Sequence, residues 1–420
     1  MCGILAIWNR SGGAPGMINP QLLARATTLM RHRGPDDEGF LLWDTTSGSR
    51  RRFWGPDTPE PVRTTPTPYQ PDADIQRAET SSAAGGAPAD LALAWRRLAI
   101  LDLSPTGHQP MVSPDASTWL VFNGEIYNFQ ELRAELRAQY GFEFRSTGDT
   151  EVLLRGYEAW GDDFLQRMNG MWGMALWDAR RQRLLVARDR LGVKPIYWTE
   201  YAGSVAFSSE ISPLLALRAA VGLTPQPYWP TVRLYLEKVI IDAGDRTFFE
   251  GINRLEPGHA CFVERDSFRI QRYWDIPAVA PRALSERAAA DEFRVLFTDS
   301  VRLRLRSDVP VGSSLSGGLD SSSVVSIAAP SLPHAMHSFS IAYNEGGIYD
   351  ERRYMKIMGE RFGLAEHIDV PDGSDLFTVL PLLVRHQEEP GGGVGLYSQW
   401  RVMQLARAAE IGRASCRERV

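Results

Sequence analysis

The sequence contains few residues of several kinds, and each shortage limits what the protein can be. Only three cysteines occur in 420 residues, at positions 2, 261 and 416, and no pair has Cys-x-x-Cys spacing. A small and odd number of cysteines argues against a disulfide framework and a structural zinc site. Long apolar runs are also absent, so neither a membrane-spanning helix nor a signal-peptide core is expected. We therefore predict a cytoplasmic protein without membrane partners.

An excess of basic charge is missing as well. The formal net charge is −5, and lysine occurs only at positions 194, 238 and 356. Without a basic excess, the surface has no general attraction for nucleic-acid phosphates or anionic lipids. This composition therefore disfavours nucleic acid and membranes as partners.

The order of the expected elements predicts two domains, as the length of the chain also does. Residues 2–221 show short apolar strands and amphipathic helices of an antiparallel α+β arrangement. Residues 286–409 alternate strand and helix, which is typical of a parallel α/β sheet. We expect residues 222–285 to connect the two. Residues 44–90 are rich in Pro, Thr, Ser, Gly and Ala, so we expect a mobile, disordered surface insertion there.

Cys2 directly follows the initiator methionine in "MCGILAIW". If Met1 is removed, Cys2 carries a thiol and a free α-amine, whose usual pKa of about 7.7–8.0 suits a general base. Nucleophile and base then share one residue, as in N-terminal-nucleophile enzymes. The alternative is a buried cysteine that is second by coincidence.

Other polar segments have the chemistry that an amide hydrolase for an amino acid needs. Asn123 and the backbone amide of Gly124 can supply two donors to an oxyanion. Arg97 can hold a carboxylate, and Glu125 and Asp149 can hold an ammonium group. Taken singly, Arg97 can instead be a charge at a strand edge, Asn123-Gly124 a plain turn, and Asp149 a helix cap.

Several motifs, in this order, resemble the glutaminase domain of class II glutamine amidotransferases: "MCGI", "RHRGPDDEG", "RRLAILDLS" with "GHQPM", "NGEIYN" and "STGDTEVLLRGYEAWG". "RDRLGVKPIYW", "FSSE" and "LEPGH" narrow the resemblance to the asparagine synthetase family. It extends over nearly the whole chain. One departure is Trp95, where that family usually has a small residue or histidine.

The resemblance implies an N-terminal Ntn-hydrolase αββα sandwich, followed by an incomplete α/β parallel-sheet domain of the ATP-pyrophosphatase (PP-loop) type. It implies Cys2 as the nucleophile and Asn123 with Gly124 as the oxyanion hole. It also implies that glutamine is bound by Arg97, Asn123, Glu125 and Asp149. A homodimer is implied too, although the residues themselves do not indicate an oligomeric state.

The segment "SGGLDSS", residues 316–322, follows an apolar stretch and opens a helix, so its amides favour an anion. The segment lacks the Gly-Lys-Ser/Thr of a Walker A loop. The alternative to an anion-binding loop is a plain joint between a strand and a helix. The loop resembles the pyrophosphate loop of synthetases that adenylate a carboxylate. That resemblance implies ATP and Mg²⁺ as cofactors, with Asp320 as the metal ligand and ATP bound by Leu315, Ser316, Gly317, Gly318, Asp320, Ser321 and Ile341.

The last residues, "EIGRASCRERV", break the helical pattern where the resembling family has another strand. We expect residues 410–420 to be a non-native tail derived from a sequencing adapter, and the synthetase domain to be truncated. On this interpretation the chain hydrolyses glutamine but forms no amide. An assay for AMP and asparagine from aspartate, ATP and ammonia tests this expectation, and formation of either product by these 420 residues would refute it.

The resemblance implies that ammonia released at Cys2 amidates an adenylated aspartate, giving asparagine, AMP and pyrophosphate. Three alternatives stay open. The acceptor can be another carboxylate, as in natural-product, exopolysaccharide or β-lactam biosynthesis. The chain can be a non-catalytic regulatory partner, which the presence of Cys2, Arg97, Asn123 and Asp149 disfavours. It can also be an ATP-pyrophosphatase of nucleotide or tRNA metabolism, which the N-terminal position of the glutaminase motifs disfavours.

Overall fold

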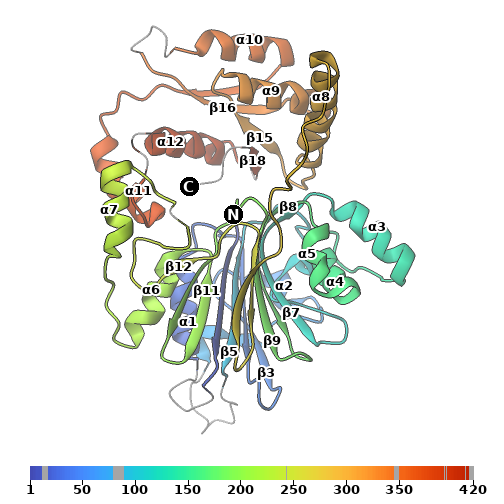
Figure 1. The fold of residues 1–420 in the computed structure, drawn as a ribbon, viewed down its shortest axis with the longest axis vertical. Helices are drawn as coiled ribbons and strands as arrows, with labels where there is room; N and C mark the ends of the chain where they lie inside the picture. Colours follow the sequence, from blue (N-terminus) through green and yellow to red (C-terminus); the bar gives the residue numbers. More distant parts are fainter. Residues whose placement is uncertain are drawn as a thin grey trace. The chain divides into compact units, whose positions relative to one another are not determined.

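A computed structural model describes residues 1–11, 18–78, 89–242, 244–344, 350–391, 393, 395–411 and 413–415. The chain divides into a first unit, Met1–Ile276, and a second unit, Pro277–Val420 (Figure 1). Within the described residues, no helix is both long and apolar enough to cross a membrane.

Two antiparallel sheets form the centre of the first unit. The first sheet has the order β12-β10-β11-β1-β5-β2-β3-β4, and only its short β3–β4 pair is parallel. Its strands are β1 (Gly3–Asn9), β2 (Asp37–Trp43), β3 (Arg50–Trp54), β4 (Ala73–Asp74), β5 (Leu91–Arg97), β10 (Tyr197–Tyr201), β11 (Ser204–Ser208) and β12 (Asn253–Arg254). The second sheet has the order β14-β13-β9-β8-β7-β6. Its strands are β6 (Met111–Val112), β7 (Thr118–Ile126), β8 (Gly170–Asp178), β9 (Arg183–Arg188), β13 (His259–Val263) and β14 (Phe268–Arg272).

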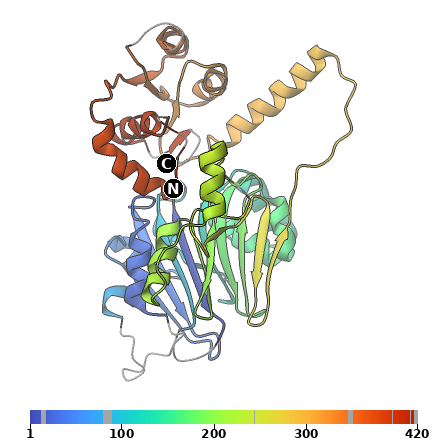
Figure 2. The same cartoon turned by 60° about the vertical axis from the view of Figure 1, so that its left-hand side comes forward.

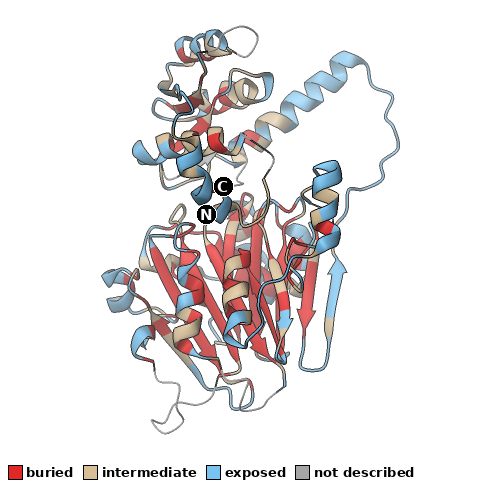
Figure 3. Cartoon of the chain, turned by 90° about the vertical axis from the view of Figure 1, so that its left-hand side faces the viewer, coloured by how far each residue is buried: buried red, intermediate tan, exposed pale blue. Residues whose placement is uncertain are grey.

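Helices cover the outer faces of both sheets, which gives the expected αββα sandwich. The first sheet is covered by α1 (Pro20–Thr28) and α6 (Ile211–Ala220). The second is covered by α3 (Phe129–Tyr140), α4 (Thr150–Trp160) and α5 (Phe164–Arg167), while α7 (Trp229–Lys238) precedes β12. Figure 3 shows that most of the strands between these helices are buried.

The sequence of strand β1 is continuously apolar from Ile4 to Trp8 and does not alternate between apolar and polar residues. Ile4, Ala6 and Trp8 belong to the core between the two sheets, whereas Leu5 and Ile7 pack in the core under α1 and α6. Both faces of β1 are therefore buried, and a strand buried on both faces needs a continuous apolar run.

The expected connector, residues 222–285, is not a separate segment for most of its length. The strands β12, β13 and β14 extend the two sheets of the first unit, where β12 pairs with β10 and β13 pairs with β9. The boundary between the units instead lies at Ile276. Apolar residues such as Cys261 and Val263 are fully buried in the sandwich core, so this part of the chain completes the first unit.

The expectation of a disordered insertion at 44–90 was wrong for the described residues 44–78. They form β3, the short helix α2 (Glu60–Thr64) and β4, and β3 pairs with β2. Phe53 and Ile75 are buried in the core under α1. The Pro- and Ser-rich composition concealed these few core residues. Residues 79–88 lie outside the described part.

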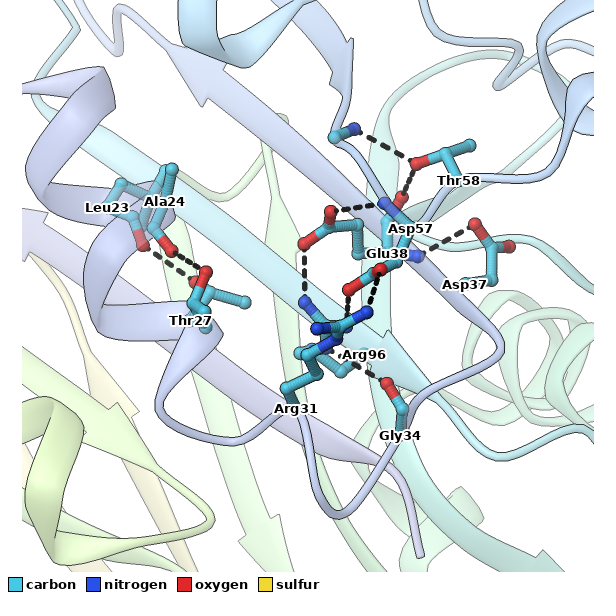
Figure 4. A network of polar contacts seen from close by, with 12 residues as sticks. Leu23, Ala24, Thr27, Arg31, Gly34, Asp37, Glu38, Asp57, Thr58 and Arg96 are labelled. Atoms are coloured by element: carbon cyan, nitrogen blue, oxygen red, sulfur yellow. Dashed lines mark hydrogen bonds and ion pairs between the residues drawn. The ribbon is translucent and has the colours of Figure 1, made fainter.

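A buried cation explains why this insertion is anchored (Figure 4). The side chain of Arg96 is 1% exposed, and its guanidinium pairs with Glu38 at 2.6 Å and with Asp57 of the insertion. Its Nε also donates to the Gly34 carbonyl at 2.9 Å. A buried guanidinium needs such partners, because an unpaired charge away from water is costly. Asp57 also pairs with Arg31, so the insertion closes over a charged cluster.

The second unit is a parallel α/β layer structure, as expected. Its sheet has the order β17-β16-β15-β18, with strands β15 (Val311–Ser314), β16 (His337–Ile341), β17 (Ala365–Asp369) and β18 (Arg413–Ser415). The helices are α8 (Glu286–Leu303), α9 (Leu319–Ala328), α10 (Arg352–Phe362), α11 (Leu376–Gln387) and α12 (Gly395–Ala408). Figure 2 shows α8 as a single long helix. Separate apolar clusters join α8 with α9, α9 with α10, and β16 with α12.

Part of the predicted non-native tail lies in a strand. Residues 413–415 form β18, which pairs in parallel with β15. Residues 412 and 416–420 lie outside the described part, and the origin of 410–420 stays a prediction.

Loss of the Asp57 carboxylate tests the anchoring of the insertion. We expect Asp57→Asn to lower the free energy of unfolding by about 3 kcal/mol, because the buried Arg96 loses one of its counter-charges. The matched control is Asp72→Asn, which removes a more exposed carboxylate paired with Arg52 in the same insertion and should cost no more than about 1 kcal/mol. Urea unfolding followed by tryptophan fluorescence measures both, and equal effects would contradict the account.

Candidate active site

Cys2 lies one residue before β1, in contact with the loop that follows β5. Its Sγ accepts the Leu98 amide proton at 3.4 Å and lies 3.7 Å from the Leu98 carbonyl, to which the thiol can donate. Arg33 Nε donates to the Cys2 carbonyl at 3.0 Å and so fixes its backbone. In the chain that retains Met1, burial raises the pKa of the Cys2 thiol, and the Met1 α-amine, the Leu98 amide, Arg97 and Lys194 oppose that rise. The thiol is therefore protonated at neutral pH and needs a base.

The pairing of β1 with β5 brings Arg97 opposite Cys2. The register joins Gly3 to Arg96, so the next pair outward is Cys2 with Arg97. Arg97 is 6% exposed, and its guanidinium donates to the carbonyls of Leu101 at 3.3 Å, Ser104 at 3.4 Å and Asp102. This loop fixes the position of the cation beside the thiol.

Asn123 is buried on β7 without a hydrogen-bond partner. It is 1% exposed, and within the part of the chain that the structure describes, neither Nδ2 nor Oδ1 is paired. A buried amide without partners costs about 1–3 kcal/mol. A bound oxyanion or carbonyl would supply the missing acceptor, so this amide is suited to receive a ligand.

Gly124 is required by its surroundings and presents an amide at the edge of β7. An added Cβ would lie 2.3 Å from the Met171 carbonyl oxygen, so no other residue fits without a shift. Phe122 and Ile126 direct their backbone amides to the edge away from β8, where Gln109 and Asp149 accept them. Since backbone groups alternate along an antiparallel strand, the Gly124 amide points to this same edge.

Asp149 and Glu125 approach the same strand. Asp149 precedes α4 but its side chain does not cap that helix; Oδ2 accepts the Ile126 amide at 2.8 Å instead. Asp149 thus occupies the N-cap position of α4 but makes no side-chain capping bond to that helix. Glu125 is 6% exposed and lies two residues from Asn123, on the same face of β7.

Lys194 belongs to this group, although the sequence analysis gave it no role. It is 3% exposed, and burial lowers its pKa to about 8, with Glu125 and Cys2 opposing the shift and Arg33 adding to it. The signal in the sequence was the rarity of lysine: this is one of three, in a chain that otherwise uses arginine.

Strand register, electrostatic interactions and a hydrogen bond link most of the predicted glutaminase residues, and Asn123 and Gly124 lie on the same strand as Glu125. Extending the β1–β5 register by one residue places Cys2 opposite Arg97, the Arg97 and Lys194 charges act on the Cys2 thiol, and Lys194 interacts with Glu125. Asp149 bonds the strand that carries Asn123 and Gly124. The arrangement offers a nucleophile, the Asn123 and Gly124 N–H donors, a cation and two carboxylates.

The glycine loop of the second unit lies between β15 and α9, at the carboxyl end of a parallel strand. Gly317 has a φ of +85°, and an added Cβ would lie 2.9 Å from the Glu351 carbonyl oxygen, so glycine is needed there. The Ser316 and Ser321 hydroxyls lie 3.0 Å apart across the loop, and Ser316 Oγ accepts the Gly318 amide at 3.2 Å. Ligands of open α/β sheets bind at this end of the strands.

The remaining predicted ATP residues surround this loop. Asp320 is exposed in the first turn of α9. Leu315 is buried, and its amide donates to the Phe339 carbonyl at 2.9 Å, next to Ile341 at the end of β16. A carboxylate and two hydroxyls beside helix amides suit a magnesium-bound phosphate group, since Mg²⁺ takes one or two carboxylates together with phosphate oxygens.

Two family models match the chain. The glutamine amidotransferase domain matches residues 83–274, which include Arg97, Asn123, Gly124, Glu125 and Asp149 but not Cys2. The asparagine synthase family matches residues 292–414, which include the glycine loop.

Curated relatives agree with both models. Asparagine synthetase (glutamine-hydrolysing) 3 of Bacillus subtilis is 36% identical over 319 residues, which are 70% of this chain and 50% of that protein. A Mycobacterium tuberculosis protein, named provisionally as a glutamine-hydrolysing asparagine synthetase, is 32% identical over 97% of this chain and 57% of its own length. Amidase chyE of Penicillium rubens is 34% identical over 70% of this chain and 45% of that protein. The chain thus spans about half the length of these relatives.

A solved structure, glutamine phosphoribosylpyrophosphate amidotransferase from Bacillus subtilis, covers 88% of this chain and 81% of its own, with 14% identity and a TM-score of 0.45.

Removal of the Lys194 charge tests the electrostatics around Cys2. A cation stabilises the thiolate, so Lys194→Gln should raise the pKa of the Cys2 thiol and move the pH profile of its alkylation to higher pH. Mass spectrometry of the Cys2 peptide after iodoacetamide treatment measures this, with Lys238→Gln, at an exposed helix position, as the control. An unchanged or lower midpoint in Lys194→Gln would contradict the assignment.

Proposed function

Because the chain belongs to the family of glutamine-hydrolysing asparagine synthetases, we propose that its first unit hydrolyses glutamine to glutamate and ammonia at Cys2. The observation that supports this most directly is the buried Asn123 amide, which has no hydrogen-bond partner among the described residues and lies on the strand whose edge carries the Gly124 amide. Both donors lie on the strand that Asp149 also bonds, and Arg97 stands opposite Cys2.

In the proposed reaction, removal of Met1 gives Cys2 a free α-amine that takes the thiol proton. The sulfur adds to the amide carbon of the glutamine side chain, and the new oxyanion accepts from Asn123 Nδ2 and the Gly124 amide. Collapse breaks the C–N bond, the α-amine returns its proton, and ammonia leaves. Water then hydrolyses the thioester to glutamate and regenerates the thiol.

The charged residues orient the substrate. Arg97 holds the α-carboxylate of glutamine, for which a guanidinium is geometrically suited. Asp149 and Glu125 hold its ammonium group, with Lys194 reducing the negative charge around Glu125. The raised pKa of the Cys2 thiol makes the base necessary.

For the second unit we propose binding of ATP with Mg²⁺ at the loop of residues 315–321 and at Ile341. Asp320 would hold the metal, which neutralises phosphate charge, and the loop amides with the Ser316 and Ser321 hydroxyls would bind the pyrophosphate portion. In the whole protein, aspartate would be adenylated and the ammonia would displace AMP to give asparagine. A cytoplasmic location and a homodimer are part of the same proposal.

A second candidate keeps the same chemistry with another acceptor. The likeness to a relative named amidase chyE favours it, because that protein shares 34% identity with this chain. The whole protein would then amidate a different carboxylate, and a screen of carboxylic acids for ATP-dependent amide formation separates the two.

Substitution of the nucleophile tests the proposal. Cys2→Ala should lower the rate of glutamine hydrolysis about a thousandfold or more, because no thioester can form. Cys261→Ala, a control at a fully buried thiol of β13, should keep the rate. Ammonia release measures both, and the intact mass confirms removal of Met1. Hydrolysis retained by Cys2→Ala would overturn the proposal.

The whole protein provides a further readout. There, Cys2→Ala should abolish amide formation with glutamine as donor but spare formation with added ammonia. Loss of both activities would argue against separate glutaminase and synthetase sites.

A further inference from the structure

The backbone of Phe122, the residue before Asn123, is held at its edge by side chains instead of a strand. The short strand β6 pairs with β7 only at Trp119 and Leu120, so the ladder on that side stops before Phe122. Without a neighbouring strand at this edge, the backbone amide and carbonyl of Phe122 on β7 would lack hydrogen-bond partners. Two side chains from other segments take these positions.

The first is Trp95 on β5. Its indole Nε1 donates to the Phe122 carbonyl at 3.0 Å. Trp95 is 1% exposed and belongs to the core between the sheets, so this bond joins the first sheet to the second. It also lies two residues from Arg97, whose guanidinium is 6.0 Å from the indole ring.

The second is Gln109, in the segment before β6. Its Oε1 accepts the Phe122 amide at 2.6 Å, and its Nε2 donates to Thr150 Oγ1 at 3.4 Å. Thr150 directly follows Asp149 at the start of α4. Gln109 is 3% exposed and thus links the strand of the oxyanion donors to the helix that carries Asp149.

Both side chains are themselves fixed. His108 packs edge-on against the Trp95 ring at 5.9 Å, and its Nδ1 lies 2.8 Å from an Asp37 carboxylate oxygen. At Gly39, an added Cβ would lie 2.0 Å from the Gln109 carbonyl oxygen, so β2 and this segment approach as closely as glycine allows.

We propose that Trp95 and Gln109 are positioning residues that hold the Phe122 peptide and thereby set where Asn123 and Gly124 present their donors. Neither needs to touch glutamine. The proposal rests on the proposed glutaminase function, and it gives a role to the tryptophan that departs from the resembling family. A shift of the donors affects mainly the transition state, because the oxyanion exists only there.

A pair of tryptophan substitutions tests this in the full chain. Trp95→Phe keeps an aromatic ring but removes the donor to Phe122. Trp119→Phe is the matched control, since Trp119 lies on β7, is also 1% exposed, and its Nε1 has no partner within the described residues. We expect Trp95→Phe to lower kcat for glutamine hydrolysis about tenfold with KM changed less than about twofold, and Trp119→Phe to leave both within about twofold.

An isosteric replacement keeps the test valid if Trp95→Phe fails to fold. Incorporation of 3-benzothienylalanine at position 95 replaces the indole N–H by sulfur at nearly constant shape. It should reproduce the loss of kcat, whereas the same residue at position 119 should not. Gln109→Met, which removes the acceptor for the Phe122 amide, should also lower kcat more than it changes KM.

Each outcome has one meaning. A fall in kcat confined to changes at 95 and 109 supports the proposal. If Trp95→Phe, the benzothienyl variant and Trp119→Phe all have the same kcat, the positioning proposal is overturned. Glutamine hydrolysis by the wild type would then still support the proposed glutaminase function. A rise in KM at constant kcat also overturns it, because that pattern indicates a binding role. A wild-type chain that hydrolyses no glutamine overturns both proposals.

Discussion

The candidate active site depends on the antiparallel pairing of β1 with β5. This register places the residue before Gly3 opposite the residue after Arg96, and so brings Cys2 and Arg97 together. It also turns Arg96 to the helix-covered face, where it binds Glu38 and Asp57. A slip of one residue would exchange these faces and move the buried cation into the place of the substrate cation. Adjacent arginines of one strand thus have separate tasks, one in stability and one in the site.

The energetic cost of the site is concentrated on β7. Its strand partner β6 ends early, so β7 carries an edge within a buried sandwich. Side chains of Trp95, Gln109 and Asp149 satisfy most of that edge. Within the described residues, the Asn123 side-chain amide on this strand stays buried without a hydrogen-bond partner. The fixed edge and the amide group of Asn123 together suit the binding of an oxyanion at this strand.

Local patterns in the sequence predicted an antiparallel α+β first unit, whereas the sandwich and the roles of the site residues followed only from the resemblance to a known family. The apolar run of β1, the periodicity of α3 and α4, and the Asn-Gly pair at 123 can be recognised within short windows. The anchoring of residues 44–78 could not be recognised in this way. It depends on the carboxylate of Asp57, which pairs with the guanidinium of Arg96, 39 positions away in the sequence. The bond from Trp95 to Phe122 joins two sheets and is equally invisible in a linear pattern. Lys194 was missed because only the fold brings it to Cys2 and Glu125.

The central claim is that Cys2 is the nucleophile of a glutamine site. The most direct measurement is covalent labelling of the chain with a diazoketone analogue of glutamine, followed by peptide mass spectrometry. The account predicts one adduct, on Cys2, which excess glutamine prevents. An adduct on Cys261 alone, or labelling of Cys2 that glutamine does not slow, would contradict it.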